Sequence, residues 1–131
     1  VKDSSYNLFE ELKIENFSIM PGSESKLLKG LELGCSGIIT ATTNVTASLA
    51  RNVYDRFTNN LTQNSNEKLC EVRSVFEKYN LISGLHTFMS QKDKKFENLL
   101  PPLKLLENNE KIDLLLNLKK IEFEIDKLKA A

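Results

Sequence analysis

Residues 31–45, LELGCSGIITATTNV, decide the fold. A helical apolar pattern ends at Leu33 and Gly34 stops it, as glycine does just beyond a helix. Residues 37–41, GIITA, follow as a largely apolar run rich in β-branched side chains, which predicts a buried strand. Asn44 leads into another helical pattern. A helix, a turn, a buried strand and a second helix are typical of parallel βα units, whose strands are covered on both faces.

The same alternation extends toward the N-terminus. Pro21-Gly22 ends a compact apolar run at residues 17–20, and Ser23 to Ser25 offer N-cap chemistry for the helix before Gly34. Residues 7–13 form a short helix candidate, preceded by a strand end at Val1-Lys2. Two strands and a strand end cannot close a sheet, so we expect the rest of the fold to lie outside this sequence.

From residue 64 the pattern becomes all-helical. Ser65 can cap one helix, residues 81–89 can form a second, and residues 99–103, LLPPL, predict an extended stop. Asn108 or Asn109 can cap the last helix. Its apolar positions are Ile112, Leu115, Leu116, Leu118, Ile121 and Ile125.

Composition and charge exclude several classes of function. The chain has 131 residues, and 18 basic residues balance 18 acidic ones, so we expect neither nucleic-acid nor membrane binding. It holds no leader and no apolar run of about 18 residues, and we expect a cytoplasmic protein. Cys35 and Cys70 match no zinc or redox spacing, and Cys35 is expected to be reduced and buried. His86 is the only histidine, so no multi-histidine metal site can be assembled, and we expect no metal.

Lys2 is the residue with the clearest chemical potential. A lysine at the carboxyl end of a parallel strand occupies the rim where α/β barrels place catalytic groups. In a partly desolvated pocket a neutral amine can attack a ketone and form a Schiff base. The alternative is an ordinary solvated lysine near a chain end.

Three segments in order resemble one family. VKDSS at residues 1–5, PGSE at residues 21–24 and LELGCSGIITATTNV at residues 31–45 are similar to successive strand-end motifs of the dihydrodipicolinate synthase and N-acetylneuraminate lyase group of class I pyruvate aldolases. LLPPLKLL at residues 99–106 resembles that family's proline-bearing segment. The resemblance implies an α/β fold: residues 1–63 would form the C-terminal three βα units of a TIM (β/α)8 barrel, and residues 64–131 a helical appendix.

The resemblance also implies site residues. Lys2 would be the catalytic Schiff-base lysine, Gly22 the small residue beside the bound keto acid, and Ile39 a backbone lining of the pyruvate pocket. Thr40 and Asn44 are further candidates. The alternatives are a turn glycine at position 22 and a buried strand residue at position 39. Tyr6 departs from the family pattern, which often has a small residue soon after the lysine.

The implied activity is that of a lyase, most similar to dihydrodipicolinate synthase, acting on pyruvate or another 2-keto acid and an aldehyde without a cofactor. N-acetylneuraminate lyase or a 2-keto-3-deoxy sugar acid aldolase is the alternative within the same chemistry. In the family an acid/base tyrosine and a carboxylate-binding threonine turn lie on earlier strands. Neither motif is found in residues 1–131. The implied partners are the remainder of the barrel and further copies of the chain in a tetramer. A non-catalytic fragment or interaction module, and a relative that binds keto acids without turnover, remain open.

Overall fold

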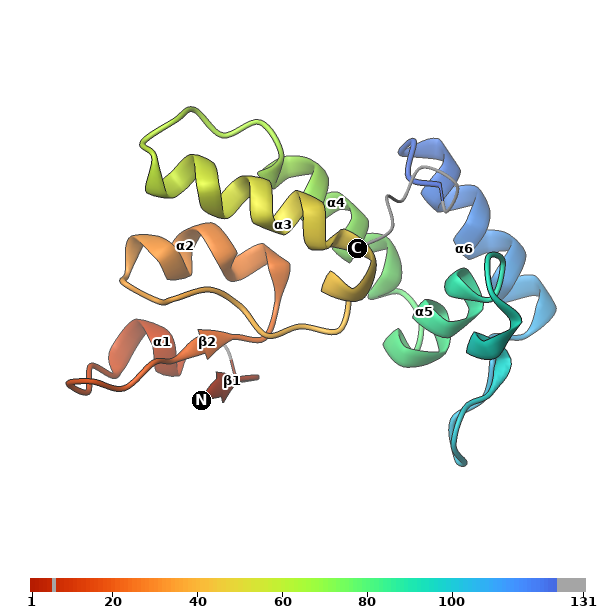
Figure 1. Ribbon diagram of the computed structural model, residues 1–131. Coiled ribbons are helices and arrows are strands. Elements are labelled where there is room, and N and C mark those ends of the chain that lie inside the picture. The colour runs from red at the N-terminus through yellow and green to blue at the C-terminus, as the bar shows by residue number, and fades with distance from the viewer. Residues whose placement is uncertain (6, 125–131) are drawn as a thin grey trace. The chain divides into compact units, whose positions relative to one another are not determined.

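The computed structural model describes residues 1–5 and 7–124 and divides the chain into two compact units, residues 1–73 and 74–131. Tyr6 and Ile125 lie outside the described residues, and the predicted boundary at 63/64 stays a prediction. The elements, shown in Figure 1, are β1 (Lys2–Asp3), α1 (Leu8–Glu11), β2 (Met20–Pro21), η1 (Glu24–Lys26), α2 (Leu27–Glu32), α3 (Thr43–Thr58), α4 (Asn66–Phe76), α5 (Leu81–Met89), η2 (Lys94–Glu97) and α6 (Asn108–Lys120).

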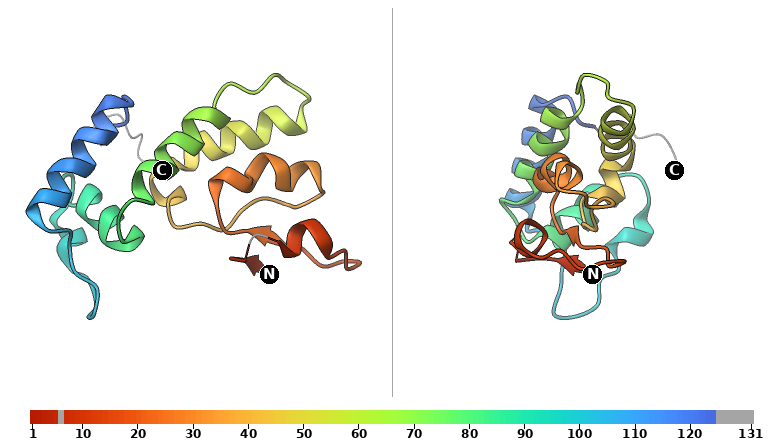
Figure 2. Two further views of the ribbon diagram at one scale, coloured as in Figure 1. Left: turned by 180° about the vertical axis from the view of Figure 1, so that it is seen from behind. Right: turned by 90° about the vertical axis from the view of Figure 1, so that its left-hand side faces the viewer.

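In the first unit, β1 and β2 pair in parallel, with Lys2 opposite Met20 and Asp3 opposite Pro21. The predicted order of strand end, helix, strand and helix is confirmed here. The helix between the two strands, α1, has only four residues. Both views in Figure 2 show α2 and α3 running side by side, with the strands on the other side of α2 from α3.

The predicted strand at residues 37–41 is wrong as a sheet strand, because the structure assigns no strand there. This segment meets β2 through one backbone hydrogen bond, from Ile39 N to Pro21 O at 3.1 Å. A single bond does not make a ladder, and the Ile39 side chain is 47% exposed rather than buried. The run at residues 17–20 likewise contributes only Met20 to β2.

The core of the first unit lies between its helices. Leu27 and Leu31 of α2 pack with Val53 of α3 and Leu69 of α4, and all four are buried. Gly34 has a φ of +90°, a left-handed conformation that favours glycine, and it ends α2 as predicted. Cys35 is half-buried rather than fully buried, and both cysteines are free.

The second unit is helical, as predicted, around an aromatic cluster. The Phe88 ring meets Phe76 edge-on at 5.7 Å and stacks on Phe123 at 5.8 Å between centroids. The predicted Asn108 or Asn109 cap of the last helix is wrong. The N-cap is Glu107, which forms a capping box with Glu110, because these two side chains satisfy the free N–H groups of the first turn.

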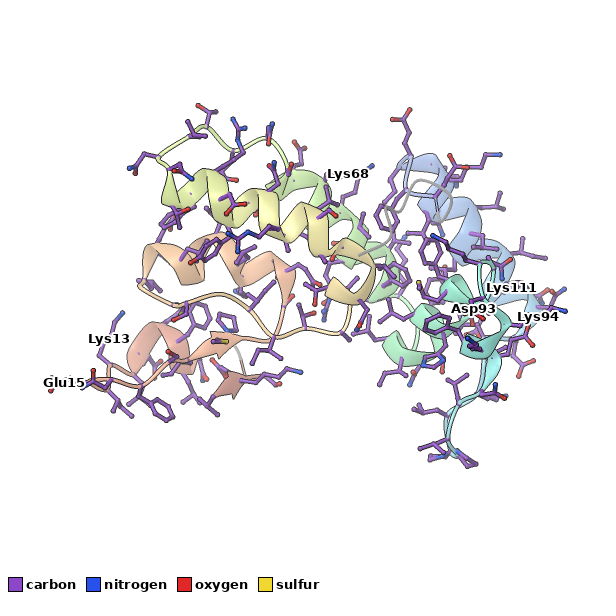
Figure 3. All side chains as sticks on the ribbon, in the orientation of Figure 1. Lys13, Glu15, Lys68, Asp93, Lys94 and Lys111 are labelled. Carbon is purple, nitrogen blue, oxygen red and sulfur yellow. The ribbon has the colours of Figure 1, made fainter. Side chains whose placement is uncertain are left out.

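Charged side chains of the second unit lie on its surface. Residues 92–95 are all exposed, and Figure 3 labels Asp93 and Lys94 among them. His86 Nδ1 lies 2.8 Å from Phe96 O, so this histidine makes an ordinary structural contact between α5 and η2. No helix in the described part of the chain is both long and apolar enough to cross a membrane.

Candidate active site

Lys2 and Gly22, separated by twenty positions in the sequence, lie beside each other at the end of the parallel strand pair. Gly22 N donates to Asp3 O at 2.8 Å, continuing the ladder one residue past β2. A methyl group in place of the Gly22 hydrogen would lie 3.1 Å from Lys2 Cε and 3.2 Å from Asp3 O. The absence of a side chain at Gly22 therefore leaves the space through which the Lys2 side chain passes.

The two faces of this strand pair differ in what they meet. Asp3 and Pro21 are buried and point to the helices, because Asp3 Oδ2 accepts from Phe9 N of α1 at 3.2 Å and Pro21 lies against Gly30 of α2. Successive residues of a strand point to opposite faces. Lys2 therefore points to the other face, where its side chain is exposed in the described chain.

Ile39 is the third predicted site residue, and the structure places its backbone next to the same strand end. Ile39 N donates to the carbonyl of Pro21, the residue before Gly22. The backbone segments at Lys2, Gly22 and Ile39 therefore lie in sequence order across one edge. Thr40 follows at the same edge, whereas Asn44 turns back to donate to Ala41 O at 2.8 Å near the start of α3.

Asp3 is a further residue of this region, and its role could not be predicted from the sequence. It is 1% exposed, and its Oδ1 accepts from the backbone N–H and the hydroxyl of Ser5 at 3.0 and 2.6 Å. Its other oxygen accepts from Phe9 N, as described above. The carboxylate therefore fixes the turn that follows Lys2 and ties it to α1.

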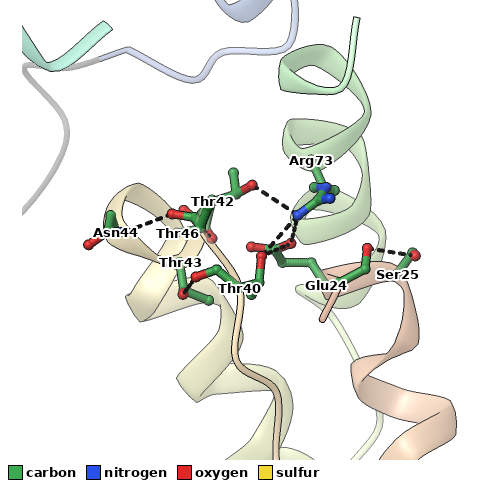
Figure 4. A network of polar contacts seen from close by, with 10 residues as sticks. Glu24, Ser25, Thr40, Thr42, Thr43, Asn44, Thr46 and Arg73 are labelled. Atoms are coloured by element: carbon green, nitrogen blue, oxygen red, sulfur yellow. Dashed lines mark hydrogen bonds and ion pairs between the residues drawn. The ribbon is translucent and has the colours of Figure 1, made fainter. Parts of the chain in front are cut away.

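A second buried carboxylate, Glu24, lies two residues beyond Gly22. It is 0% exposed and forms a salt bridge with Arg73 of α4, with Nη1 and Oε2 3.0 Å apart. Figure 4 shows this ion pair together with the threonines that surround it. In the sequence, Glu24 falls in a segment with N-cap chemistry and Arg73 carries no recognisable signal, because the two residues are 49 positions apart and no local pattern connects them.

Two threonines complete this network. Thr40 Oγ1 donates to Glu24 Oε2 at 2.9 Å, and Arg73 Nη1 donates to the hydroxyls of Thr40 at 2.9 Å and Thr42 at 3.3 Å. Glu24 Oε1 is buried and accepts no hydrogen bond from the described residues. We call Glu24, Arg73, Thr40 and Thr42 the strand-end network, since it joins the segment after Gly22 to the segment after Ile39.

The network also affects a neighbouring thiol. Burial raises the pKa of Cys70 on α4, and the negative charge of Glu24 raises it further. Burial likewise raises the pKa of Cys35. Both thiols are thereby kept in the neutral form at neutral pH, which disfavours nucleophilic chemistry at either.

Comparison with protein families identifies the chain. A family model described as the Dihydrodipicolinate synthetase family matches residues 1–121. The chain belongs to this family. The resemblance noted from VKDSS, PGSE and the stretch at residues 31–45 is confirmed by this match. A sequence search of curated proteins finds no match.

Solved structures of the dihydrodipicolinate synthase group share the fold of this family member. Dihydrodipicolinate synthase from Agrobacterium tumefaciens superposes with a TM-score of 0.72 at 18% identity, over 92% of this chain and 42% of its own. N-acetylneuraminate lyase from Proteus mirabilis gives 0.72 at 21% identity, over 90% and 42%. A prophage protein of the dihydrodipicolinic acid synthase family from E. coli K12, solved in complex with pyruvate, gives 0.54 at 19% identity, over 82% and 38%.

The chain thus spans less than half the length of these relatives. The structural similarity supports the predicted fold class to this extent: the chain has part of the fold of these enzymes. The assignment of residues 1–63 to three βα units of the barrel stays a prediction.

Proposed function

We propose that this chain supplies the Schiff-base lysine and part of the keto-acid pocket of a pyruvate-dependent carbon–carbon lyase. The observation that carries the proposal is the contact between Lys2 and Gly22 at the end of the parallel strand pair. Membership of the dihydrodipicolinate synthetase family supports a lyase of the class I aldolase type. The pyruvate bound in the related E. coli prophage protein supports a 2-keto acid as the substrate.

The chemistry proposed for Lys2 follows from its amine. Neutral Nζ attacks C2 of pyruvate, and the carbinolamine loses water to give an iminium ion. The iminium withdraws electrons, so the methyl group loses a proton and an enamine forms. The enamine carbon attacks the aldehyde carbon to form a new carbon–carbon bond, and water then releases the product and restores the amine. The proton transfers need a positioned acid/base group, which in the family is a tyrosine on an earlier strand.

The other parts of the proposal concern substrate and assembly. The aldehyde belongs to a dihydrodipicolinate synthase-type reaction, and cleavage of an N-acetylneuraminate-like or 2-keto-3-deoxy sugar acid is the second candidate. The equal TM-scores of the synthase and the lyase favour neither. The protein works without a cofactor, in the cytoplasm, with the rest of the barrel and as a tetramer.

The test is reductive trapping of the protein that carries this chain. Pyruvate and borohydride are added, and the reduced adduct is located by peptide mapping. We expect labelling at Lys2, none at that position in Lys2→Arg, and unchanged labelling in Lys94→Arg, since Lys94 is an exposed lysine of the second unit. A protein that pyruvate labels equally at both lysines, or at neither, would contradict the proposal.

A further inference from the structure

Arg73 crosses from α4 to the two backbone segments that bear the predicted pocket residues. Through Glu24 it holds the turn after Gly22, and through Thr40 it holds the segment after Ile39. The Arg73 and Glu24 side chains are 7% and 0% exposed. A charge placed this deeply is costly unless it is paired, so both ions depend on the pair.

The hydrogen-bond pattern shows that Arg73 connects these segments rather than only neutralising Glu24. Its Nη1 lies within 3.3 Å of one carboxylate oxygen and two hydroxyl oxygens, which come from η1 and from the residues leading into α3. Thr40 also donates to the same oxygen of Glu24. The three groups meet at one guanidinium nitrogen, so removing Arg73 detaches both segments from α4 and leaves only the Thr40–Glu24 and Ile39–Pro21 hydrogen bonds between them.

Lys2 is held by a different set of contacts. Its strand pairs with β2, and the Asp3 carboxylate that follows it accepts hydrogen bonds from Ser5 and from Phe9 N. The reacting amine and the wall of the pocket are thus each anchored by a buried carboxylate, Asp3 for one and Glu24 for the other.

We propose that Arg73 is a positioning residue of the keto-acid site, which holds the Gly22 and Ile39 segments at the spacing that binds the keto acid. This role rests on the proposed function. It differs from the role of Lys2, because Arg73 acts through Glu24 and Thr40 and does not touch the reacting atoms.

The experiment measures the pyruvate concentration that gives half-maximal borohydride trapping and, separately, the trapping rate at saturation. In Arg73→Met we expect the half-saturating pyruvate concentration to rise roughly 10- to 100-fold, because a shift of the pocket segments by about 1 Å can cost up to about 100-fold. The rate at saturation should stay within about threefold of the wild-type rate, as expected when only ground-state binding is lost. A merely structural role would lower the labelled fraction without moving half-saturation.

Conservative and double variants give a second readout. Arg73→Lys keeps a cation opposite the buried Glu24 carboxylate, so it should recover part of the affinity that Arg73→Met loses. The double variant Arg73→Met/Glu24→Gln removes the unpaired buried carboxylate as well, so it should bind pyruvate more tightly than Arg73→Met alone.

Lys68→Met is the matched control. Lys68 lies on the same helix and pairs with Glu71 at 3.4 Å on the surface, so its removal should leave half-saturation unchanged (Figure 3). Amide hydrogen exchange should increase at residues 23–26 and 36–42 of Arg73→Met and not at residues 1–5, Met20 or Gly22, whose amides belong to the strand pair. A labelled wild-type protein with unchanged half-saturation and exchange in Arg73→Met would overturn this inference alone. Absence of labelling at wild-type Lys2 would overturn the proposed function and, with it, this role of Arg73.

Discussion

Gly22→Ala is the substitution that most directly tests the contact between Gly22 and the Lys2 side chain. The new methyl group would lie 3.1 Å from Lys2 Cε, 3.2 Å from Asp3 O and 3.4 Å from Ser4 Oγ. The first two distances are shorter than ordinary carbon contacts, whose optimum is about 3.5–4.0 Å, so neighbouring atoms must move by a few tenths of an ångström.

The two crowded atoms differ in how easily they move. Asp3 O is a backbone atom that accepts the 2.8 Å hydrogen bond from Gly22 N, and shifting it disturbs the strand pair. Lys2 Cε belongs to a flexible, exposed side chain. We therefore expect Lys2 to swing away, at a cost in unfolding free energy of about 1–2 kcal/mol, within the range for overpacking. The rate of pyruvate trapping should fall by about 10- to 100-fold, because a displacement of about 1 Å is enough for such a loss.

Gly30→Ala is the matched control for this prediction. Its methyl group would lie 3.2 Å from Pro21 Cγ, on the face of β2 that meets α2 and not on the Lys2 face. Gly30 lies in α2, where alanine gains about 1 kcal/mol in helix propensity, which offsets part of the crowding. The control should therefore lose little stability and keep the trapping rate at Lys2.

The assay combines denaturant unfolding with timed pyruvate and borohydride labelling of both variants. A Gly22→Ala protein that folds and traps pyruvate at the wild-type rate would refute the reasoning, since the methyl group would then not compete with Lys2. Equal slowing in Gly30→Ala would refute it too, because distortion of β2 would then explain both results.

Two further predictions concern the second unit. Phe88→Ala should lower the free energy of unfolding by about 3–5 kcal/mol, because the ring is 1% exposed and packs between Phe76 and Phe123. A denaturant midpoint near the wild-type value would contradict this prediction. The hydrogen bond from Lys104 and its charge lower the pKa of Glu107. The stability that this carboxylate contributes is therefore complete above the usual glutamate pKa of about 4.3 and is lost as pH falls below it. Melting curves recorded between about pH 3 and pH 7 should show this loss in the wild-type protein and not in Glu107→Gln.

Most of the helices could be predicted from the sequence, because each carries its own apolar period and end signals. The helix predicted at residues 81–89 is α5 as observed, and Gly34 ends α2 because its left-handed φ suits glycine. That residues 37–41 form no sheet strand could not be predicted in the same way. An apolar β-branched run specifies that a segment can be extended, but a ladder also requires a bonded partner along its length, and here one hydrogen bond joins it to β2.

The residues of the candidate site likewise differ in whether a local sequence pattern indicates them. Lys2, Gly22 and Ile39 could be named because they fall in recognisable segments at strand ends. Arg73 could not, since nothing near it in the sequence indicates that its partner lies 49 residues earlier. Pairing across that distance follows from how α4 packs against α2 and α3, and hydrophobic spacing predicts the helix without predicting the partner of its buried charge.

Both segments that carry the proposed chemistry are anchored by a carboxylate close behind the site residue. Asp3 follows Lys2 directly and turns to the backbone of α1, whereas Glu24 follows Gly22 by two residues and turns to Arg73. Backbone N–H groups stay in place when side chains change, but a guanidinium can be removed by one substitution. The position of Lys2 should therefore tolerate changes in α4 that the pocket wall does not, so loss of keto-acid binding without loss of the reactive amine is the expected consequence of mutation at Arg73.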